Sequence, residues 1–196
     1  MNHLKILGLL AMAAASLMAF ASSAWAAPTL TSPTGMEYTG TIHLTLEPGT
    51  SLLVKAGIES TCTESTMHGV VAVNNMTHAE VPLTATGTPP TGLSFGHCTK
   101  HTTVINPGTL TISDTGTAFL INTRVQIRDT GLEVSCFYGA EGIPVDIGKL
   151  TGGTPATLDI NTTELKRLPG SSFFCAANGT MTGGYLVTTP NTLLIT

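Results

Sequence analysis

The clearest pattern in the chain is a period-two alternation of apolar and polar residues in short runs. Over residues 41–46, Ile42, Leu44 and Leu46 alternate with polar residues, and a Pro-Gly pair follows at 48–49. Successive side chains of a strand point to opposite faces, so these three apolar side chains share one face. The pattern predicts an amphipathic strand that ends at a tight turn.

Other short runs rich in Val, Ile, Phe and Thr follow the same plan, with Asp-Thr-Gly turns at 114–116 and 129–131. Short strands separated by turn signals predict an all-β fold, a Thr-rich β-sandwich or barrel-like fold, and no long helical period supports a βαβ plan. We expect a helical turn only over Asn161–Leu168, with Glu164 as a capping residue for Thr162 or Asn161. The further predicted strands are 69–73, 118–121, 125–127 and 157–160.

Residues 1–26 have the pattern of an export signal. Lys5 gives a positive start, an apolar run follows, and Ala24 and Ala26 form a small-x-small cleavage site. We therefore predict cleavage between Ala26 and Ala27 and a secreted protein, extracellular or periplasmic. An uncleaved membrane anchor is the alternative. No later run approaches the ~20 apolar residues of a membrane span, so we expect no transmembrane segment in the mature chain.

An exported chain meets an oxidising compartment, in which disulfides form and persist. The four cysteines are Cys62, Cys98, Cys136 and Cys175. Zinc sites built from cysteines use close pairs such as C-x-x-C, whereas these cysteines are far apart along the chain. We therefore predict two disulfides, no metal site and no cofactor. Four cysteines allow three connectivities.

An internal repeat selects among these connectivities. Residues 57–62 (GIESTC) reappear as 131–136 (GLEVSC), and three weaker matches keep the same order, one of them between 95–98 (FGHC) and 173–175 (FFC). We interpret the pattern as a duplication that gives two similar β repeats, each with one disulfide. The halves could form one domain or two. The predicted repeats are 27–106 and 107–196, and the predicted bonds are Cys62–Cys98 and Cys136–Cys175.

A resemblance to known proteins rests on structural motifs. The signal peptide, the two G-(I/L)-x-x-x-C segments, a Phe-containing segment before the second cysteine, and GGYLVTTP at 183–190 resemble a large group of small secreted bacterial proteins of unknown function. Residues 57–62 and Gly69 are more faintly similar to the secreted alkane oxidation activators of the PraB kind. That similarity implies an extracellular or surface role connected with apolar material, and it supplies no catalytic residues.

Composition and motifs limit the possible chemistry. The chain is 42% hydrophobic and 10% charged, with 8 basic residues against 12 acidic ones, so it lacks a basic stripe for nucleic acid. It contains no nucleophile elbow, zinc-protease helix or phosphate loop. We expect its aspartates to bond the local backbone. We expect the repeat-equivalent Glu59 and Glu133 to face solvent from strands. The aspartates are Asp114, Asp129, Asp146 and Asp159.

The histidines are unevenly distributed, because all those after the signal fall in the first half. His97 and His101 flank Cys98, but residues four apart on a strand lie ~13 Å from each other, too far to share one ion. We predict exposed or locally bonded histidines, with a weak metal or pH response as the alternative. Mild acid should then act on the first half selectively. The remaining histidines of this half are His43, His68 and His78.

Three classes of function follow. We expect a non-catalytic secreted or cell-surface protein that binds a partner, a surface polymer, an envelope protein or itself, through Thr ladders or free strand edges. The first alternative is an accessory factor that handles hydrophobic substrates, which needs an apolar pocket between the sheets. The second is an exported enzyme of unrecognised type, which needs a cleft with converging Asp or His.

Overall fold

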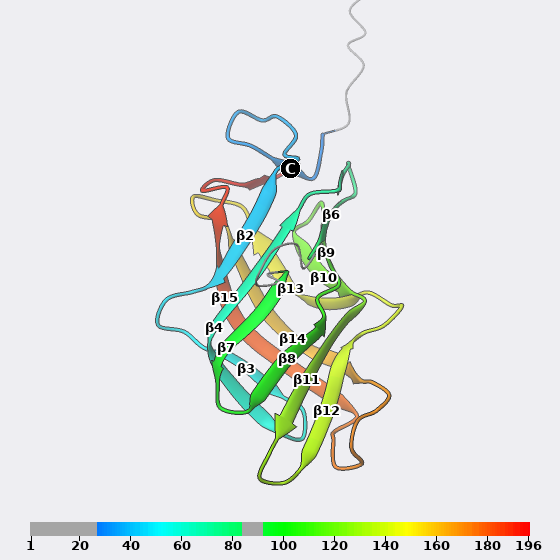
Figure 1. The fold of residues 1–196 in the computed structure, drawn as a ribbon. Helices are drawn as coiled ribbons and strands as arrows, with labels where there is room; N and C mark the ends of the chain where they lie inside the picture. Colours follow the sequence, from blue (N-terminus) through cyan, green and yellow to red (C-terminus); the bar gives the residue numbers. More distant parts are fainter. Residues whose placement is uncertain (1–26, 84–91) are drawn as a thin grey trace, which may run out of the picture.

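We describe the protein from a computed structural model, which defines residues 27–83 and 92–196. These residues form antiparallel strands and no helix, so the predicted all-β class is confirmed (Figure 1). Accordingly, none of them belongs to a helix able to cross a membrane. The predicted signal peptide, with Ala24 and Ala26, lies outside the described residues, whereas Ala27 is the first described residue and is exposed.

The strands vary in length, and β4, β14 and β15 are the longest. In chain order the strands are β1 (Leu30–Thr31), β2 (Thr41–Leu46), β3 (Leu52–Lys55), β4 (Glu59–Val70), β5 (Val73–Asn74), β6 (His78–Pro82), β7 (Leu93–Cys98), β8 (His101–Asn106), β9 (Thr109–Ser113), β10 (Thr117–Ile121), β11 (Thr123–Asp129), β12 (Val134–Ala140), β13 (Val145–Thr151), β14 (Thr157–Arg167), β15 (Asn178–Thr189) and β16 (Leu194–Ile195).

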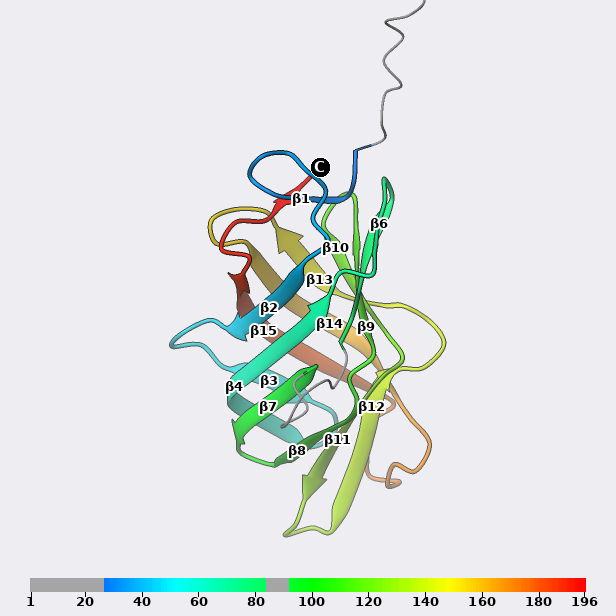
Figure 2. The same cartoon turned by 45° about the horizontal axis from the view of Figure 1, so that its top comes forward.

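One large, strongly curved sheet contains every strand except the β1–β16 pair. The short strands β2 and β3 both lie between β4 and β15, and β7 pairs with the other edge of β4. Strand β14 pairs along its length with β15, while its other edge pairs with β13 and then β12. The sheet continues from β13 through β10, β9, β6 and β5, and from β12 through β11 and β8. Figures 1 and 2 show that this branching sheet curls into a barrel-like shape.

The two sequence halves contribute to the same sheet. Strand β15 pairs with β2 and β3, β9 pairs with β6, and β11 pairs with β8. The buried apolar side chains of both halves form one cluster, which includes the predicted strand face of Ile42, Leu44 and Leu46. The halves 27–106 and 107–196 therefore share a single hydrophobic core.

The expected helical turn over Asn161–Leu168 is wrong, because most of this segment belongs to β14. Its pairing with β15 shifts register between Thr162 and Leu165, which marks a β-bulge. At this bulge the Glu164 amide donates to the Thr162 hydroxyl at 3.3 Å, so the contact read as a helix cap belongs to a bulged strand. The extra residue puts Thr162 and Leu165, three apart, both in the buried interior, which imitates helical spacing.

Candidate functional site

One end of the barrel gathers three chain segments from different parts of the sequence. They are the β3–β4 turn (56–58), the β11–β12 turn (130–133) and the long connection from β14 to β15 (168–177), which we call the aromatic loop. Figures 1 and 2 show all three at the lower end, which we call the aromatic end. The Ala176 amide donates to the Ala56 carbonyl at 3.4 Å, and Ser172 donates to Ser135 at 2.9 Å. The aromatic loop is thus bonded both to the β3–β4 turn and to β12.

The aromatic loop presents two adjacent phenylalanines to solvent. The side chains of Phe173 and Phe174 are 90% and 76% exposed, and their ring centroids lie 6.1 Å apart in an edge-to-face arrangement. The sequence match of 95–98 with 173–175 did not identify this feature, because it treated the second segment as a repeat element. The available signal was that two of the chain's six phenylalanines stand together, just before a cysteine and just after a Pro-Gly pair.

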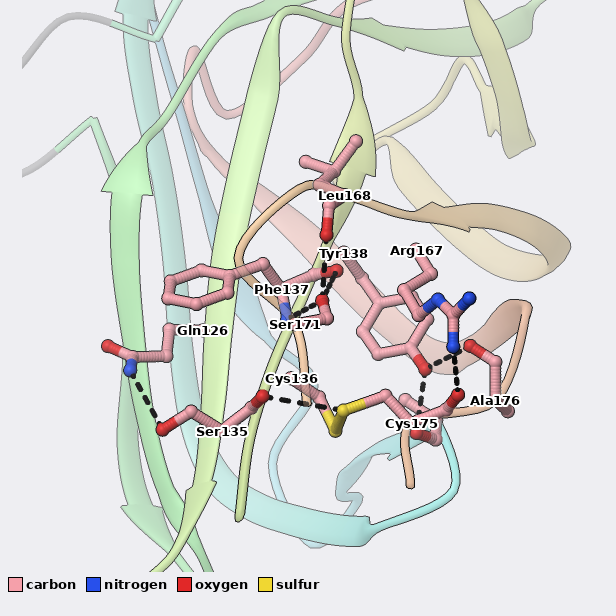
Figure 3. Close-up of a disulfide and its surroundings, with 11 residues drawn as sticks. Gln126, Ser135, Cys136, Phe137, Tyr138, Arg167, Leu168, Ser171, Cys175 and Ala176 are labelled. Atoms are coloured by element: carbon pink, nitrogen blue, oxygen red, sulfur yellow. Dashed lines mark hydrogen bonds between the residues drawn. A yellow bond between two sulfur atoms is a disulfide. The ribbon is translucent and has the colours of Figure 1, made fainter. Parts of the chain in front are cut away.

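A disulfide fixes the base of the aromatic loop. Cys175 is bonded to Cys136 of β12, as predicted, and both cysteines are buried (Figure 3). The Cys175 sulfur also lies 3.4 Å from the Ser135 carbonyl oxygen. Since Cys175 directly follows Phe174, the covalent bond restricts the position of the exposed rings.

Hydrogen bonds fix the rest of the loop (Figure 3). The Ser171 hydroxyl accepts a hydrogen bond from the Phe137 amide at 2.9 Å. The same hydroxyl lies within donating distance of the Leu168 and Phe137 carbonyls, at 2.8 and 3.1 Å. The buried Tyr138 hydroxyl lies within hydrogen-bond distance of the Ala56 and Ala176 carbonyls, at 2.7 and 2.6 Å. These bonds satisfy polar groups that would otherwise favour other loop conformations.

Two arginines border the loop. The Arg124 guanidinium stacks on the Phe137 ring, 4.7 Å from its centroid, and donates to the Pro169 carbonyl at 2.6 Å and to Glu141 at 2.9 Å. Arg167 donates one N–H to the Cys175 carbonyl at 2.9 Å and is exposed. Next to it opens a hollow of about 510 Å³, whose lining includes both Arg167 and Phe173. The hollow therefore places a cation beside an exposed aromatic ring.

Basic residues concentrate near this end of the molecule. Apart from Lys5 and Lys149, every lysine and arginine of the chain lies on the aromatic loop's neighbouring strands or on the turns beside them. Three of them pair with carboxylates, namely Lys55 with Glu59 at 3.5 Å, Lys100 with Asp129 at 2.6 Å and Arg124 with Glu141. The other three are Arg128, Lys166 and Arg167.

The other predicted disulfide, Cys62–Cys98, is also confirmed and has a different setting. Its cysteines are direct cross-strand partners in β4 and β7. Beside it, the exposed His97 contacts Glu64 at 3.0 Å and has φ 48°. The Cys62–Cys98 disulfide thus joins two strands that are already hydrogen-bonded to each other.

The histidines do not gather into a metal site. His43 and His68 face each other across β2 and β4 with ring centroids 5.8 Å apart, and His43 Nδ1 lies 3.0 Å from the Thr188 hydroxyl. Burial, and secondarily the nearby His68, lowers the pKa of His43. His78 contacts Glu80 at 3.3 Å, and His101 contacts Thr103 at 3.2 Å. Across residues 27–83 and 92–196, no three potential metal ligands lie close enough to hold an ion.

Two of the candidate aspartates, Asp129 and Asp146, bond the local backbone, as expected. Asp129, at the end of β11, accepts from the Gly131 and Leu132 amides at 2.9 and 3.2 Å, and Asp146, near the start of β13, accepts from Gly148 at 2.9 Å. The hydrogen bond from Lys100 holds the pKa of Asp129 below its usual range, with partial burial opposing it and the two amides assisting. Asp114, Asp159 and Glu59 are exposed. Glu133 is exposed as well, but it lies in the β11–β12 turn with φ 53° instead of in a strand.

The interior offers a very small cavity. It has a volume of about 20 Å³, and its lining includes Met67, Phe95, Val125 and Met181. A cavity of that size holds about one water-sized probe, so it cannot accommodate an apolar chain. The aromatic end, in contrast, exposes its two phenylalanines to solvent.

No protein-family model, curated protein or solved structure matches this chain.

Proposed function

We propose that this chain is a non-catalytic exported protein that binds a component of the cell envelope through its aromatic end. The observation that carries the proposal is the exposure of Phe173 and Phe174 on a loop that a disulfide and several hydrogen bonds hold in place. Large aromatic side chains contribute much of the binding energy where they become buried in an interface.

The rigidity of the loop supports a binding role. Ordering a mobile loop on binding costs conformational entropy, and a preformed loop avoids most of that cost. Here the Cys136–Cys175 bond, Ser171 and Tyr138 fix the loop before any partner arrives.

The disulfides are compatible with the proposed location. Such bonds persist in extracellular and periplasmic compartments and are rare in reducing ones. The described cysteines are all paired, in agreement with export by the predicted signal over residues 1–26. A partner in the envelope or outside the cell would then be within reach of the aromatic end.

The proposal is tested by sedimentation with the envelope fraction of the producing cell. We expect the wild-type protein to sediment with envelopes and the Phe173→Ser, Phe174→Ser double variant to stay in solution. Met36→Ser is the matched control, because Met36 is 70% exposed and lies in the β1–β2 connection at the opposite end. Equal sedimentation of wild type and double variant, or none by either, would refute the proposal.

A further inference from the structure

We infer that the surface bound by the aromatic end is an anionic lipid bilayer. This inference rests on the proposed function and specifies its partner. Phe173 and Phe174 would enter the boundary between headgroups and acyl chains, while Arg167 and the neighbouring basic residues would contact the headgroup phosphates.

The phenylalanines have the exposure that insertion requires. With 90% and 76% of their side chains exposed, almost all of their apolar area is available to a new contact. They lie on a surface connection between two strands, and a fluid lipid surface adapts to exposed side chains without needing a matching pocket. Aromatic and aliphatic side chains of peripheral proteins bind at this boundary because it receives apolar groups near polar ones.

Charge complementarity selects an anionic surface. Arg128, Lys166 and Arg167 make none of the ion pairs found among the described residues, although the whole chain carries a net charge of −4. Each basic residue near an anionic membrane surface strengthens attraction to it, and a guanidinium binds phosphate oxygens through two N–H groups at once. The exposed carboxylates of Glu133, in the β11–β12 turn, and of Glu164, beside Lys166, offset part of this charge, so the aromatic end keeps a small positive excess while the whole chain is negative.

The hollow beside the loop brings the two kinds of contact together. It has a volume of about 510 Å³, with Arg167 and Phe173 both in its lining. Arg167 uses one N–H for the Cys175 carbonyl, which holds the guanidinium at the base of the loop. A phosphate at Arg167 and an acyl chain at Phe173 would therefore share one hollow.

The test is co-sedimentation with vesicles of phosphatidylcholine alone and of phosphatidylcholine mixed with phosphatidylglycerol. We expect the wild-type protein to bind the anionic vesicles, with an affinity that falls as salt is raised. Removing one phenylalanine that becomes buried in the bilayer should weaken binding by about tenfold or more. The double variant Phe173→Ser, Phe174→Ser should therefore show no measurable binding. Arg167→Gln should weaken it by about fivefold.

Matched variants separate these effects from general ones. Phe173→Leu with Phe174→Leu should keep most of the binding, since it keeps apolar side chains. Lys149→Gln removes an exposed charge on β13, outside the aromatic end, and should bind like wild type, as should Met36→Ser. Thermal unfolding of each variant shows whether it is folded at the temperature of the assay.

Each outcome decides the inference. Equal binding to neutral and anionic vesicles, no binding to either, or unchanged binding by the Ser double variant would overturn it. If the Ser double variant loses binding to cell envelopes and the wild-type protein does not bind pure lipid vesicles, the proposed function stands and the partner is an envelope protein or polymer. If wild type binds neither envelopes nor vesicles, both proposals fall.

Discussion

The two disulfides of this protein close chain segments of similar length but act on different kinds of structure. Cys62 and Cys98 are 36 residues apart and lie opposite each other in paired strands, whereas Cys136 and Cys175 are 39 residues apart and join a strand to the aromatic loop. The first bond reinforces a sheet that backbone hydrogen bonds already define. The second fixes a segment that has no strand partner of its own.

The surfaces beside the two bonds differ in the same way. Near Cys98 the exposed neighbour is His97, which contacts a glutamate at 3.0 Å. Next to Cys175 the exposed neighbours are Phe173 and Phe174, at 90% and 76% exposure. Because a covalent bond restricts whatever lies beside it, the same chemistry stabilises the fold at one site and presents an apolar surface at the other.

The strongest way to break this comparison is to remove each bond in turn. Cys62→Ala with Cys98→Ala, and Cys136→Ala with Cys175→Ala, should each lower the free energy of unfolding by about 2–4 kcal/mol, because both release loops of similar length in the unfolded chain. Only the second pair should also abolish envelope binding and speed amide exchange over residues 168–177. Chemical denaturation and hydrogen exchange measure the two effects. Loss of binding in both pairs would remove the distinction.

The strands and the cysteine pairing can be predicted from the sequence because the strand pattern is local and each repeat contains two cysteines. Period-two burial at Ile42, Leu44 and Leu46 needs only one buried face, and the pairing follows from one early and one late cysteine in each repeat. The bulge at Thr162–Leu165 could not be predicted in this way, since it depends on how β15 pairs with β14.

The exposed phenylalanines show the same limit at the candidate site. Phe95 and Phe173 open the two matched segments that end in Cys98 and Cys175, but Phe95 lies on β7 and packs against the core. Phe173 lies in the aromatic loop, where no strand covers it. A local match cannot tell these environments apart, because the strands that would cover a side chain come from distant parts of the chain.

The two buried tyrosines sharpen the comparison. Tyr138→Phe would leave the Ala56 and Ala176 carbonyls without their hydroxyl partner, at a cost of about 1–3 kcal/mol in the free energy of unfolding. Tyr185→Phe should cost about 1 kcal/mol, since Ser65 keeps its bond to the Ser94 carbonyl. Denaturation measures both values. Only Tyr138→Phe should speed amide hydrogen exchange in the aromatic loop. An equal increase with Tyr185→Phe would contradict the role of Tyr138 in fixing that loop.

The Lys100–Asp129 pair connects the β7–β8 turn, which follows the first disulfide, to the end of β11. Because the folded pKa of Asp129 lies below its unfolded value of about 3.9, the ionised form stabilises the fold above about pH 4. This stabilisation is lost as pH falls through the folded pKa. Asp129→Asn should therefore be less stable at neutral pH and lose less stability in acid. Unfolding measured across the acid range tests this, and parallel curves for variant and wild type would refute it.

The smallest expected effect is a pH response at His43. Its folded pKa lies below the ordinary value of about 6.5, so stability is complete above that pH and declines as pH falls below it. His43→Gln should reduce the decline between about pH 7.5 and about pH 5.5, measured by denaturation. Residues 107–196 contain no histidine, so hydrogen exchange, corrected for its intrinsic rate, should change mainly in residues 27–106. Equal changes in both halves would contradict the assignment.

The most direct measurement uses tryptophan fluorescence, since the chain has 1 tryptophan, Trp25 of the predicted signal peptide. In a Trp25→Phe background, Phe174→Trp places the only indole on the aromatic loop, and Met36→Trp places it at the opposite end as a control. We predict that anionic vesicles shift the emission of the Phe174→Trp protein to shorter wavelength and leave the Met36→Trp protein unchanged. An equal shift in both proteins, or no shift at position 174, would contradict the claim that the aromatic end is the binding surface.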